Sequence, residues 1–392
     1  MNKAHTGWVL LLAYVGFVSL GLPDSVIGVA WPSMRRAFGL PLDALGPYFV
    51  VATAGYFLSS FNSGRLVNRC GVGLVLAVSS LITALSLLGY ALSPLWIIIV
   101  SLSFLGGLGA GAVDSGINTF AAVRFTNRHV NWLHACWGIG AATGPAIMTA
   151  VLKHGVSWRW GYVVIMGILL ALTLGFFATL HLWRIDDREN TRPEPHAPRR
   201  NTLRLSETWL SIGIFFIYCG IEASTGQWSY SLLVESRSIS PVTAGLWVSL
   251  YWGSLTAGRF LIGAISNHVP PVRLLRVCMC GVALGLVVFG LRVGHGFEAV
   301  GLGITGFSLA VIFPTLISQT PRRFDSTHVA NVVGFQVAAA SAGIAVVPAL
   351  VGVVARRAGL EVLPGLLIAA TIAMIVLHEA VVRRSPATGT AR

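Results

Sequence analysis

Twelve runs of predominantly apolar residues limit the possible folds of this chain more than any other feature of its sequence. A helix needs about 20 such residues to cross the hydrocarbon core of a bilayer. Inside lipid, the backbone N–H and C=O groups of a spanning segment must be hydrogen-bonded internally, so each run is expected to be helical. The predicted transmembrane helices are 7–31, 45–64, 72–92, 94–120, 131–152, 159–183, 208–234, 243–265, 272–292, 296–320, 329–355 and 361–382.

The first run is predicted to be a helix and not a cleavable signal. It is as long as a full span, and no small-residue cleavage site follows a brief apolar core.

The composition supports a membrane protein and excludes a soluble one. Of the 392 residues, 55% are hydrophobic and 10% are charged, whereas soluble domains carry about 25% charged residues. The formal net charge of +13 comes mostly from arginines in short stretches between the apolar runs. That placement is typical of membrane ends. Because no basic stripe is interleaved with stacking aromatics, nucleic acid is not an expected partner.

No motif for covalent chemistry is present. The sequence contains no P-loop, HExxH or GxSxG segment and no cluster of metal-ligand spacings, so neither an enzyme nor a cofactor is expected. There is no CxxC pair, and we predict no disulfide and no metal site. The five cysteines are expected to be small core or loop residues: Cys70, Cys136, Cys219, Cys278 and Cys280.

A polar stretch at 184–207 divides the chain into two similar halves. It contains three prolines and charges of both signs, and it cannot bury enough apolar surface to fold alone. We therefore predict a six-helix bundle at 1–183, a cytoplasmic linker at 184–207 and a second six-helix bundle at 208–392. Segments 64–71 and 263–270 resemble each other, as do the segments that begin at Pro145 and Pro348. The predicted fold is an all-α membrane protein of twelve helices in two pseudo-symmetric halves.

Lys and Arg residues predict the orientation in the membrane. If both termini lie on one side, that side holds 19 of the 27 Lys and Arg residues, and the other side holds 8. The positive-inside rule then places both termini and the linker in the cytoplasm, with the chain in the inner membrane.

The loop after the second run resembles a signature of the major facilitator superfamily, G-x-L-a-D-R-x-G-R-R. Matching residues are Gly64, Leu66, Arg69 and Gly71. Asn68 stands at the acidic position, and Val72 and Gly73 replace the basic pair, so the charged latch of this loop is weakened. With the six-plus-six plan, the resemblance implies an alternating-access carrier. It also suggests that Arg69 has a gating role.

Two further segments resemble the fucose–proton symporter-like branch of that superfamily. One is the Asp114-x-x-x-Asn118 segment, and the other runs from Asn131 through His134 and Trp137 to Pro145. Segments around 218–222 and 312–315 fit as well. This resemblance implies proton-coupled symport and assigns the coupling role to Asp114.

Three acids, Asp24, Asp114 and Glu222, lie well inside predicted spans and away from their ends. An ionisable side chain there costs about 2.5–3.5 kcal/mol on insertion scales and marks a functional site by default. Asp114, with Asn118 one turn further on, is expected to exchange the proton or to bind substrate. The alternative is a permanently hydrogen-bonded structural acid. Glu222, near Gln227, is expected to bind substrate or to act as a second proton site, and a structural hydrogen bond is equally compatible with its position.

Asp24 shares one helical face with Gly28 and Trp31, spaced at i, i+4 and i+7. That face would suit a polar ring that stacks on Trp31 while Asp24 accepts hydrogen bonds from its hydroxyl groups. The alternative for Asp24 is an N-cap-like acid in a helix kinked by Pro23.

Other candidates are less specific. His134, Trp137, Gln227 and Gln336 are predicted cavity residues, although His134 also fits a structural hydrogen bond. Arg259 lies within a span near its cytoplasmic end and is predicted to be structural or gating. With no Lys or Arg evident at mid-depth, a carrier of organic anions is disfavoured.

The sequence thus predicts proton-coupled symport of a neutral polar solute such as a monosaccharide or a related polyol. The alternative is a proton-coupled exporter of cationic or lipophilic molecules. Sodium coupling stays open, since an Asp–Asn pair also coordinates cations. A sensor would carry a soluble output domain, which the sequence lacks. A monomer is expected to suffice.

Overall fold

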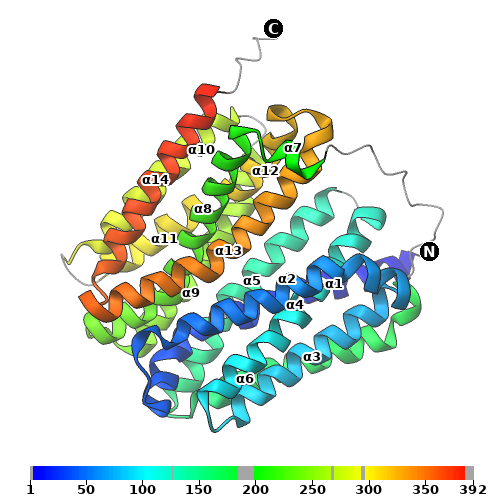
Figure 1. The fold of residues 1–392 in the computed structure, drawn as a ribbon. Helices are drawn as coiled ribbons and strands as arrows, with labels where there is room; N and C mark the ends of the chain where they lie inside the picture. The colour runs from blue at the N-terminus through cyan, green and yellow to red at the C-terminus, as the bar shows by residue number, and fades with distance from the viewer. Residues whose placement is uncertain (1–2, 126, 184–197, 266–268, 293–295, 385–392) are drawn as a thin grey trace.

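The structure is a computed structural model that describes residues 3–125, 127–183, 198–265, 269–292 and 296–384. Six long helices form the first half (Figure 1). They are α1 (Lys3–Phe38), α2 (Gly46–Cys70), α3 (Val72–Leu92), α4 (Trp96–Arg124), α5 (Asn127–Lys153) and α6 (Trp158–Ala178). Short 3-10 turns follow α1 and α6, at η1 (Leu42–Leu45) and η2 (Leu180–Leu182).

The second half repeats this plan. After the short α7 (Arg199–Thr202) come α8 (Ser206–Ser231), which continues into a π-helical turn η4 (Leu232–Ser236), α9 (Pro241–Ile265), α10 (Pro271–Gly290), α11 (Phe297–Leu309), α12 (Ile312–Arg323), α13 (Ser326–Ala358) and α14 (Val362–Arg384). Residues 184–197 of the predicted linker lie outside the described residues. The rest of it forms α7 and the start of α8.

One expected helix is interrupted. The run predicted as one span over 296–320 is divided into α11 and α12 at Ala310 and Val311. Pro314 lacks the N–H that would bond to the carbonyl of Ala310, and its ring crowds that carbonyl, which favours a break at this point. Beside this break, the carbonyl of Leu309 at the end of α11 accepts a hydrogen bond of 3.1 Å from the Tyr218 hydroxyl.

Within the described residues, eleven segments are long and apolar enough to cross a membrane, with α11 and α12 counted together. The remaining long helix, α9, coincides with the predicted run at 243–265. Large apolar side chains such as Leu174, Val277 and Val376 are more than 60% exposed. Lipid is the solvent that suits such a surface, so the chain is a multi-pass membrane protein.

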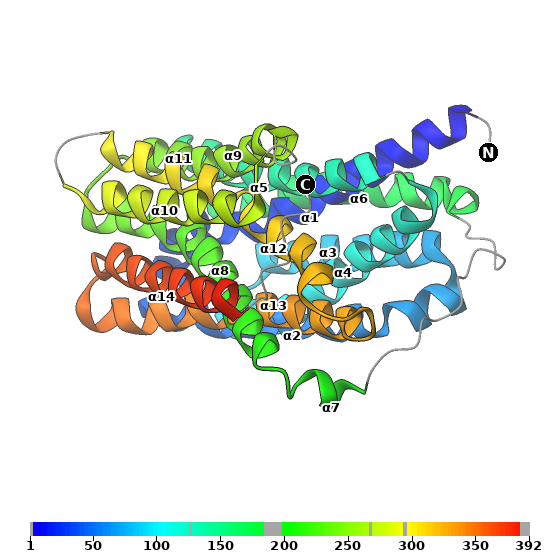
Figure 2. The same cartoon turned by 90° about the horizontal axis from the view of Figure 1, so that it is seen from above.

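Helices α1–α6 gather on one side of the molecule and α8–α14 on the other (Figure 1). Seen from above, α3 and α4 lie opposite α10 and α14 (Figure 2). The N-terminal end of α1, the C-terminal end of α14 and α7 lie at the same end of the bundle, which we call the linker end (Figure 1). The opposite end, where α1 turns into α2, is called the distal end.

Glycines bring corresponding helix pairs together in the two halves. A methyl group built at Gly140 of α5 would lie 1.9 Å from the carbonyl oxygen of Val18 in α1, and one at Gly107 of α4 would lie 1.9 Å from that of Ala52 in α2. In the second half, Gly343 of α13 approaches the Phe216 carbonyl of α8 in the same way, at 2.1 Å. Small residues permit such close backbone contact between membrane helices. The halves are therefore built alike.

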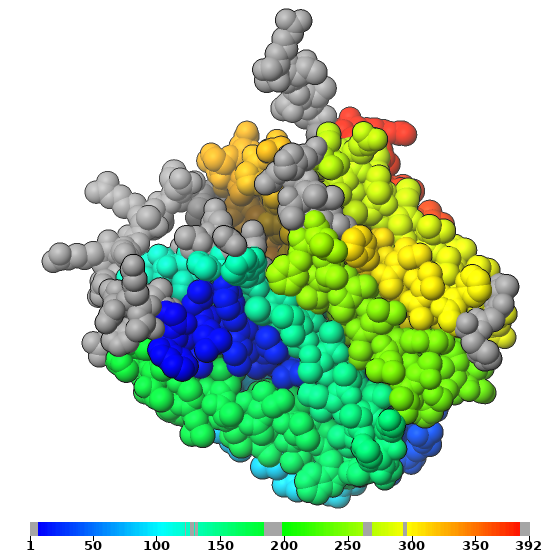
Figure 3. Space-filling view, turned by 180° about the vertical axis from the view of Figure 1, so that it is seen from behind, coloured from blue at the N-terminus to red at the C-terminus, as the bar shows by residue number. Residues whose placement is uncertain are grey.

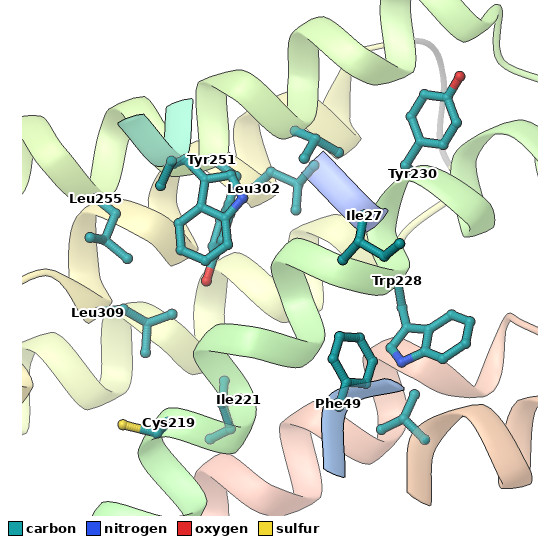
Figure 4. Packing of buried hydrophobic residues seen from close by; sticks show 14 of the residues in the cluster. Ile27, Phe49, Cys219, Ile221, Trp228, Tyr230, Tyr251, Leu255, Leu302 and Leu309 are labelled. Carbon is teal, nitrogen blue, oxygen red and sulfur yellow. The ribbon is translucent and has the colours of Figure 1, made fainter. Parts of the chain in front are cut away.

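The boundary between the halves is apolar towards the distal end. Ile27 of α1 and Phe49 of α2 lie beside Trp228 of α8 in one buried cluster (Figure 4). Trp228 is fully buried, and its indole N–H donates to the carbonyl of Pro348 in α13.

Candidate functional site

A cavity of about 320 Å³ lies between the two halves. Ligand pockets in proteins commonly measure about 300–1,000 Å³, so a small solute fits. Helices of both halves supply its wall, and the first half supplies most of it. The lining residues are Leu20, Pro23, Asp24, Tyr48, Phe49, Ala52, Thr53, Tyr56, Thr83, Leu87, Tyr90, Ser103, Gly106, Gly107, Ala110, Asp114, Trp137, Glu222, Ala223, Gln227, Trp252, Ser341 and Ile344.

Asp114 of α4 lies in this wall with neutral partners on both carboxylate oxygens. The Tyr56 hydroxyl donates to Oδ2 at 2.5 Å, and the Asn118 amide, one turn along the same helix, donates to Oδ1 at 3.0 Å. Asn118 itself is not among the lining residues. The predicted pair of Asp114 and Asn118 is thus formed, and Tyr56 and Asn118 together orient the Asp114 carboxylate.

Asp24 of α1 lies in the same wall and is exposed to the cavity. The indole N–H of Trp137 in α5 donates to its Oδ2 at 3.2 Å. Gln227 of α8 crosses from the other half, and its amide donates to the backbone carbonyl of Asp24 at 2.7 Å. The sequence candidates Asp24, Trp137 and Gln227 are therefore brought together.

The solute-binding face predicted for Asp24, Gly28 and Trp31 is open to the cavity only at Asp24. A methyl group at Gly28 would lie 2.8 Å from the Gln227 carbonyl oxygen, so this position is filled by α8 and leaves no gap for a ligand. Trp31 is fully buried, its ring centroid is 5.1 Å from that of Trp96, and it does not line the cavity. The expected stacking of a substrate on Trp31 is not supported by this geometry.

Glu222 is the acid that the second half contributes. The Tyr218 hydroxyl donates to its carboxylate, and the Tyr251 hydroxyl donates to its backbone carbonyl at 2.8 Å. A guanidinium nitrogen of Arg259 lies 4.0 Å from the Glu222 carboxylate. Arg259 thus supplies positive charge beside the cavity, and that charge faces an acid of its own half.

The other candidates lie outside the cavity wall. The ring of His134 packs edge-on against Phe17 at 5.2 Å. Gln336 bonds to Ser211 at 2.6 Å and to Thr320, in a separate small pocket between α8, α12 and α13. Arg69 is exposed at the linker end of α2. Gln336 therefore does not meet the solute in this geometry, because α13 turns it towards α8 and α12.

The family model of the Major Facilitator Superfamily matches residues 13–292 and, in a second match, 210–391. The chain belongs to this superfamily. It is a membrane transporter and not an enzyme, and the fold predicted from the sequence is confirmed.

Several relatives of this transporter match over most of its length. Bypass of stop codon protein 6 of Saccharomyces cerevisiae is 23% identical over 91% of this chain and 78% of its own length. The glucose/mannose transporter GlcP of Bacillus subtilis is 24% identical, with 87% and 86% covered. Sodium-dependent glucose transporter 1 of Homo sapiens is 22% identical, with 86% and 71% covered. A crystal structure of the nucleoside transporter NupG has the same fold, with a TM-score of 0.79 at 11% identity over 95% of this chain and 99% of that one.

Several wall residues of this transporter are not among the site residues predicted from its sequence. Tyr48, Ala52 and Tyr56 of α2 line the cavity at a spacing of four residues, and Trp252 of α9 lines it from the other half. Their spacing was visible in the sequence. However, Tyr and Trp also collect at membrane interfaces, so the sequence alone does not separate an interface position from a place in the cavity wall.

Two ion pairs join the halves of the transporter at the distal end. Arg35, near the end of α1, binds Glu235 in η4 at 2.8 Å, and Arg356 of α13 binds Asp43 in η1 at 3.1 Å. A methyl group built at Gly46 of α2 would lie 3.2 Å from the Cβ of Ala349 in α13, so these helices approach closely there. At the linker end, the described residues show no ion pair between the halves. These contacts hold the two halves together at the distal end.

Proposed function

We propose that this transporter is a proton-coupled symporter of a neutral polar solute, namely a hexose or a related polyol, and that it works by alternating access. The observation that carries the proposal is the position of Asp114. It lies in the wall of a cavity between the halves, and among the described residues its carboxylate accepts hydrogen bonds from the neutral side chains of Tyr56 and Asn118.

The wall suits a solute with many hydroxyl groups. Asp24 and Asp114 offer acceptors, and the hydroxyl groups of Tyr48, Tyr90 and Thr83 offer further donors and acceptors. Aromatic rings supply flat apolar surface against which a sugar ring can pack. The relatives named as glucose transporters support the same substrate class.

The charges around the cavity suit a solute that is itself uncharged. Arg259, beside the wall, is paired with Glu222. Among the described residues, the wall therefore offers no unpaired positive charge that could bind an anionic solute. We therefore assign proton exchange to Asp114 and solute binding to Asp24, Trp137 and Gln227. Glu222, expected from the sequence as a second proton site, has its charge balanced by Arg259 and is assigned to the wall.

The difference between the two ends supports the proposal of alternating access. The closed distal end carries the ion pairs of Arg35 and Asp43, and opening it requires both to separate. With the linker end in the cytoplasm, as the positive-inside rule favours, this conformation faces inwards. One chain forms the whole cavity, which supports a monomer as the transporting unit.

The test uses purified protein in liposomes with a pH-sensitive dye inside. Hexoses, polyols and amines are added outside in sodium-free buffer. Acidification of the lumen with one sugar supports symport. No response to any sugar, with or without sodium, contradicts the proposed substrate class.

Two alternatives have specific support and are separated by the same assay. A relative is named as a sodium-dependent glucose transporter, so sugar uptake that requires sodium and leaves the lumen pH unchanged would indicate sodium coupling. Acids without a cationic partner also suit a cationic solute. Alkalinisation with an amine, absent from empty liposomes, would indicate an exporter.

A further inference from the structure

Arg259 of α9 contacts groups of both halves beside the cavity. In its own half, a guanidinium nitrogen lies 4.0 Å from the Glu222 carboxylate. In the other half, its Cζ lies 5.3 Å from the ring centroid of Trp137, and its Nη1 donates to the backbone carbonyl of His134 at 3.4 Å. The space-filling view shows α5 and α9 against each other on this face of the molecule (Figure 3).

Trp137 is held on several sides. Its indole N–H donates to Asp24 at 3.2 Å, one ring face lies under Arg259, and the ring meets Trp252 edge-on at 5.7 Å. Trp252 and Arg259 are seven residues apart and so lie on one face of α9. A methyl group at Gly138 would lie 2.2 Å from Thr256 Oγ1, which shows how closely α5 and α9 approach beside Trp137.

We infer that Arg259 is a positioning residue that acts on Asp24 through Trp137. Glu222 anchors the guanidinium, the guanidinium fixes the indole, and the indole N–H directs the Asp24 carboxylate into the cavity. The inference rests on the proposed function in one respect, namely that Asp24 binds the solute.

Only an arginine fits both contacts. A guanidinium is planar, so it can lie on an indole ring while its nitrogens face a carboxylate. A lysine ammonium would keep the charge beside Glu222 but would not present a flat surface to Trp137. The Arg259→Lys substitution therefore separates charge balance from positioning.

A second hydrogen bond holds the backbone at Asp24 independently of Arg259 and Trp137. Gln227 binds the backbone carbonyl of Asp24 at 2.7 Å, independently of the carboxylate. Loss of Arg259 therefore leaves α1 in place and releases only the direction of the Asp24 side chain. The expected phenotype is weaker solute binding in a folded protein.

The first experiment needs no solute. Unfolding midpoints in detergent are measured for the wild type, Arg259→Lys, Asp24→Asn and the double variant, and again for all four with Trp137→Phe. If Trp137 connects the two residues, the midpoint of the double variant falls by less than the sum of the falls in the two single variants. In the Trp137→Phe series, the falls in midpoint become additive. Additive losses in both series would overturn the inference.

The second experiment measures affinity for the hexose that the wild type transports. Arg259→Lys is expected to raise Kd about tenfold, or about 1.4 kcal/mol, with a smaller effect on the maximal rate, and to have no further effect in Asp24→Asn. An equal rise in both backgrounds would show that Arg259 acts without Asp24. Wild-type affinity in Glu222→Gln/Arg259→Gln would show that Arg259 only balances charge. If no hexose binds the wild type, the proposed function fails, whereas the unfolding experiment still decides the inference.

Discussion

The hydroxyl of Tyr56 donates a hydrogen bond of 2.5 Å to Oδ2 of Asp114, and both side chains lie in the wall of the cavity between the halves. The two residues come from different helices, α2 and α4, which Gly107 brings into backbone contact. Because Tyr56 and Asn118 are neutral, they orient the carboxylate without cancelling its charge. This geometry leads to the first prediction.

Asp114→Asn should abolish proton-driven accumulation and leave solute exchange measurable. The amide keeps the size of the side chain and an oxygen that accepts from Tyr56, but it neither takes up nor releases a proton at neutral pH. A pH gradient of one unit is worth about 1.4 kcal/mol, enough for about tenfold accumulation with one proton per solute. Uptake into proteoliposomes with and without this gradient measures the effect. Wild-type accumulation in the variant would remove Asp114 from the coupling mechanism.

Arg35→Gln should shift the transporter towards the state in which the distal end is open. Arg35 binds Glu235 through bonds of 2.8 and 2.9 Å, and partly exposed pairs of this kind contribute up to about 1 kcal/mol. That corresponds to a population shift of up to about fivefold. The measurement is the rate at which a maleimide, added on the distal side, labels Ala349→Cys in a protein without the native cysteines.

Arg36→Gln is the matched control, because Arg36 is the exposed neighbour of Arg35 on the same helix. The exchanged pair Arg35→Glu/Glu235→Arg should restore slow labelling. Equal labelling rates in Arg35→Gln and Arg36→Gln would show that the ion pair does not hold the distal end closed.

The fold could be predicted because the membrane imposes a length on each helix. The apolar runs locate the long helices, but they do not define the helix ends. The sequence predicts that the first helix ends at residue 31, but α1 continues to Phe38. In this extra part, Arg35 forms an ion pair with Glu235 of the other half. The break between α11 and α12 was missed because hydropathy does not register the lost N–H of Pro314.

The site could be predicted only in part, because an apolar run does not show how its helix is rotated. Ionisable residues within spans gave the strongest signal, and Asp24, Asp114 and Glu222 all line the cavity. Trp31 and Gln336 point into packed regions instead, and the sequence contains no comparable sign of that. Some partners of these acids, such as Tyr56 and Arg259, come from other helices and follow from packing alone.

Gly140→Ala should destabilise the first half. The added methyl group would lie 1.9 Å from the Val18 carbonyl oxygen, so α1 and α5 would have to separate. Overpacking of this kind costs about 1–3 kcal/mol, and the unfolding midpoint in detergent should fall. Gly167→Ala in α6 is the control, since nothing lies within 4 Å of its added methyl group. It should be neutral or gain up to about 1 kcal/mol from helix propensity. Equal midpoints for the two variants would contradict the close contact.

Glu361 should make the stability of the second half depend on pH in the acid range. It lies in the short connection between α13 and α14, outside the spans, and binds Arg237 at 2.9 Å and Arg292 at 2.8 Å. Burial alone would raise the pKa of Glu361, but the hydrogen bonds from Arg237, Ser236 and Arg292 outweigh it and lower the pKa from 4.5 to about 2. In the unfolded chain these bonds are absent.

Because the folded-state pKa is the lower one, this contribution is complete above about pH 4.5 and is lost as the pH falls towards 2. The unfolding midpoint of the wild type should therefore exceed that of Glu361→Gln by a constant margin from pH 7 to pH 5, and the margin should shrink below that. At neutral pH, Arg292→Gln should lower the unfolding midpoint less than Arg237→Gln does. The Arg292 side chain is 63% exposed, whereas that of Arg237 is 5% exposed. A margin that stays constant down to pH 3 would show that the charge of Glu361 does not stabilise this end of the bundle.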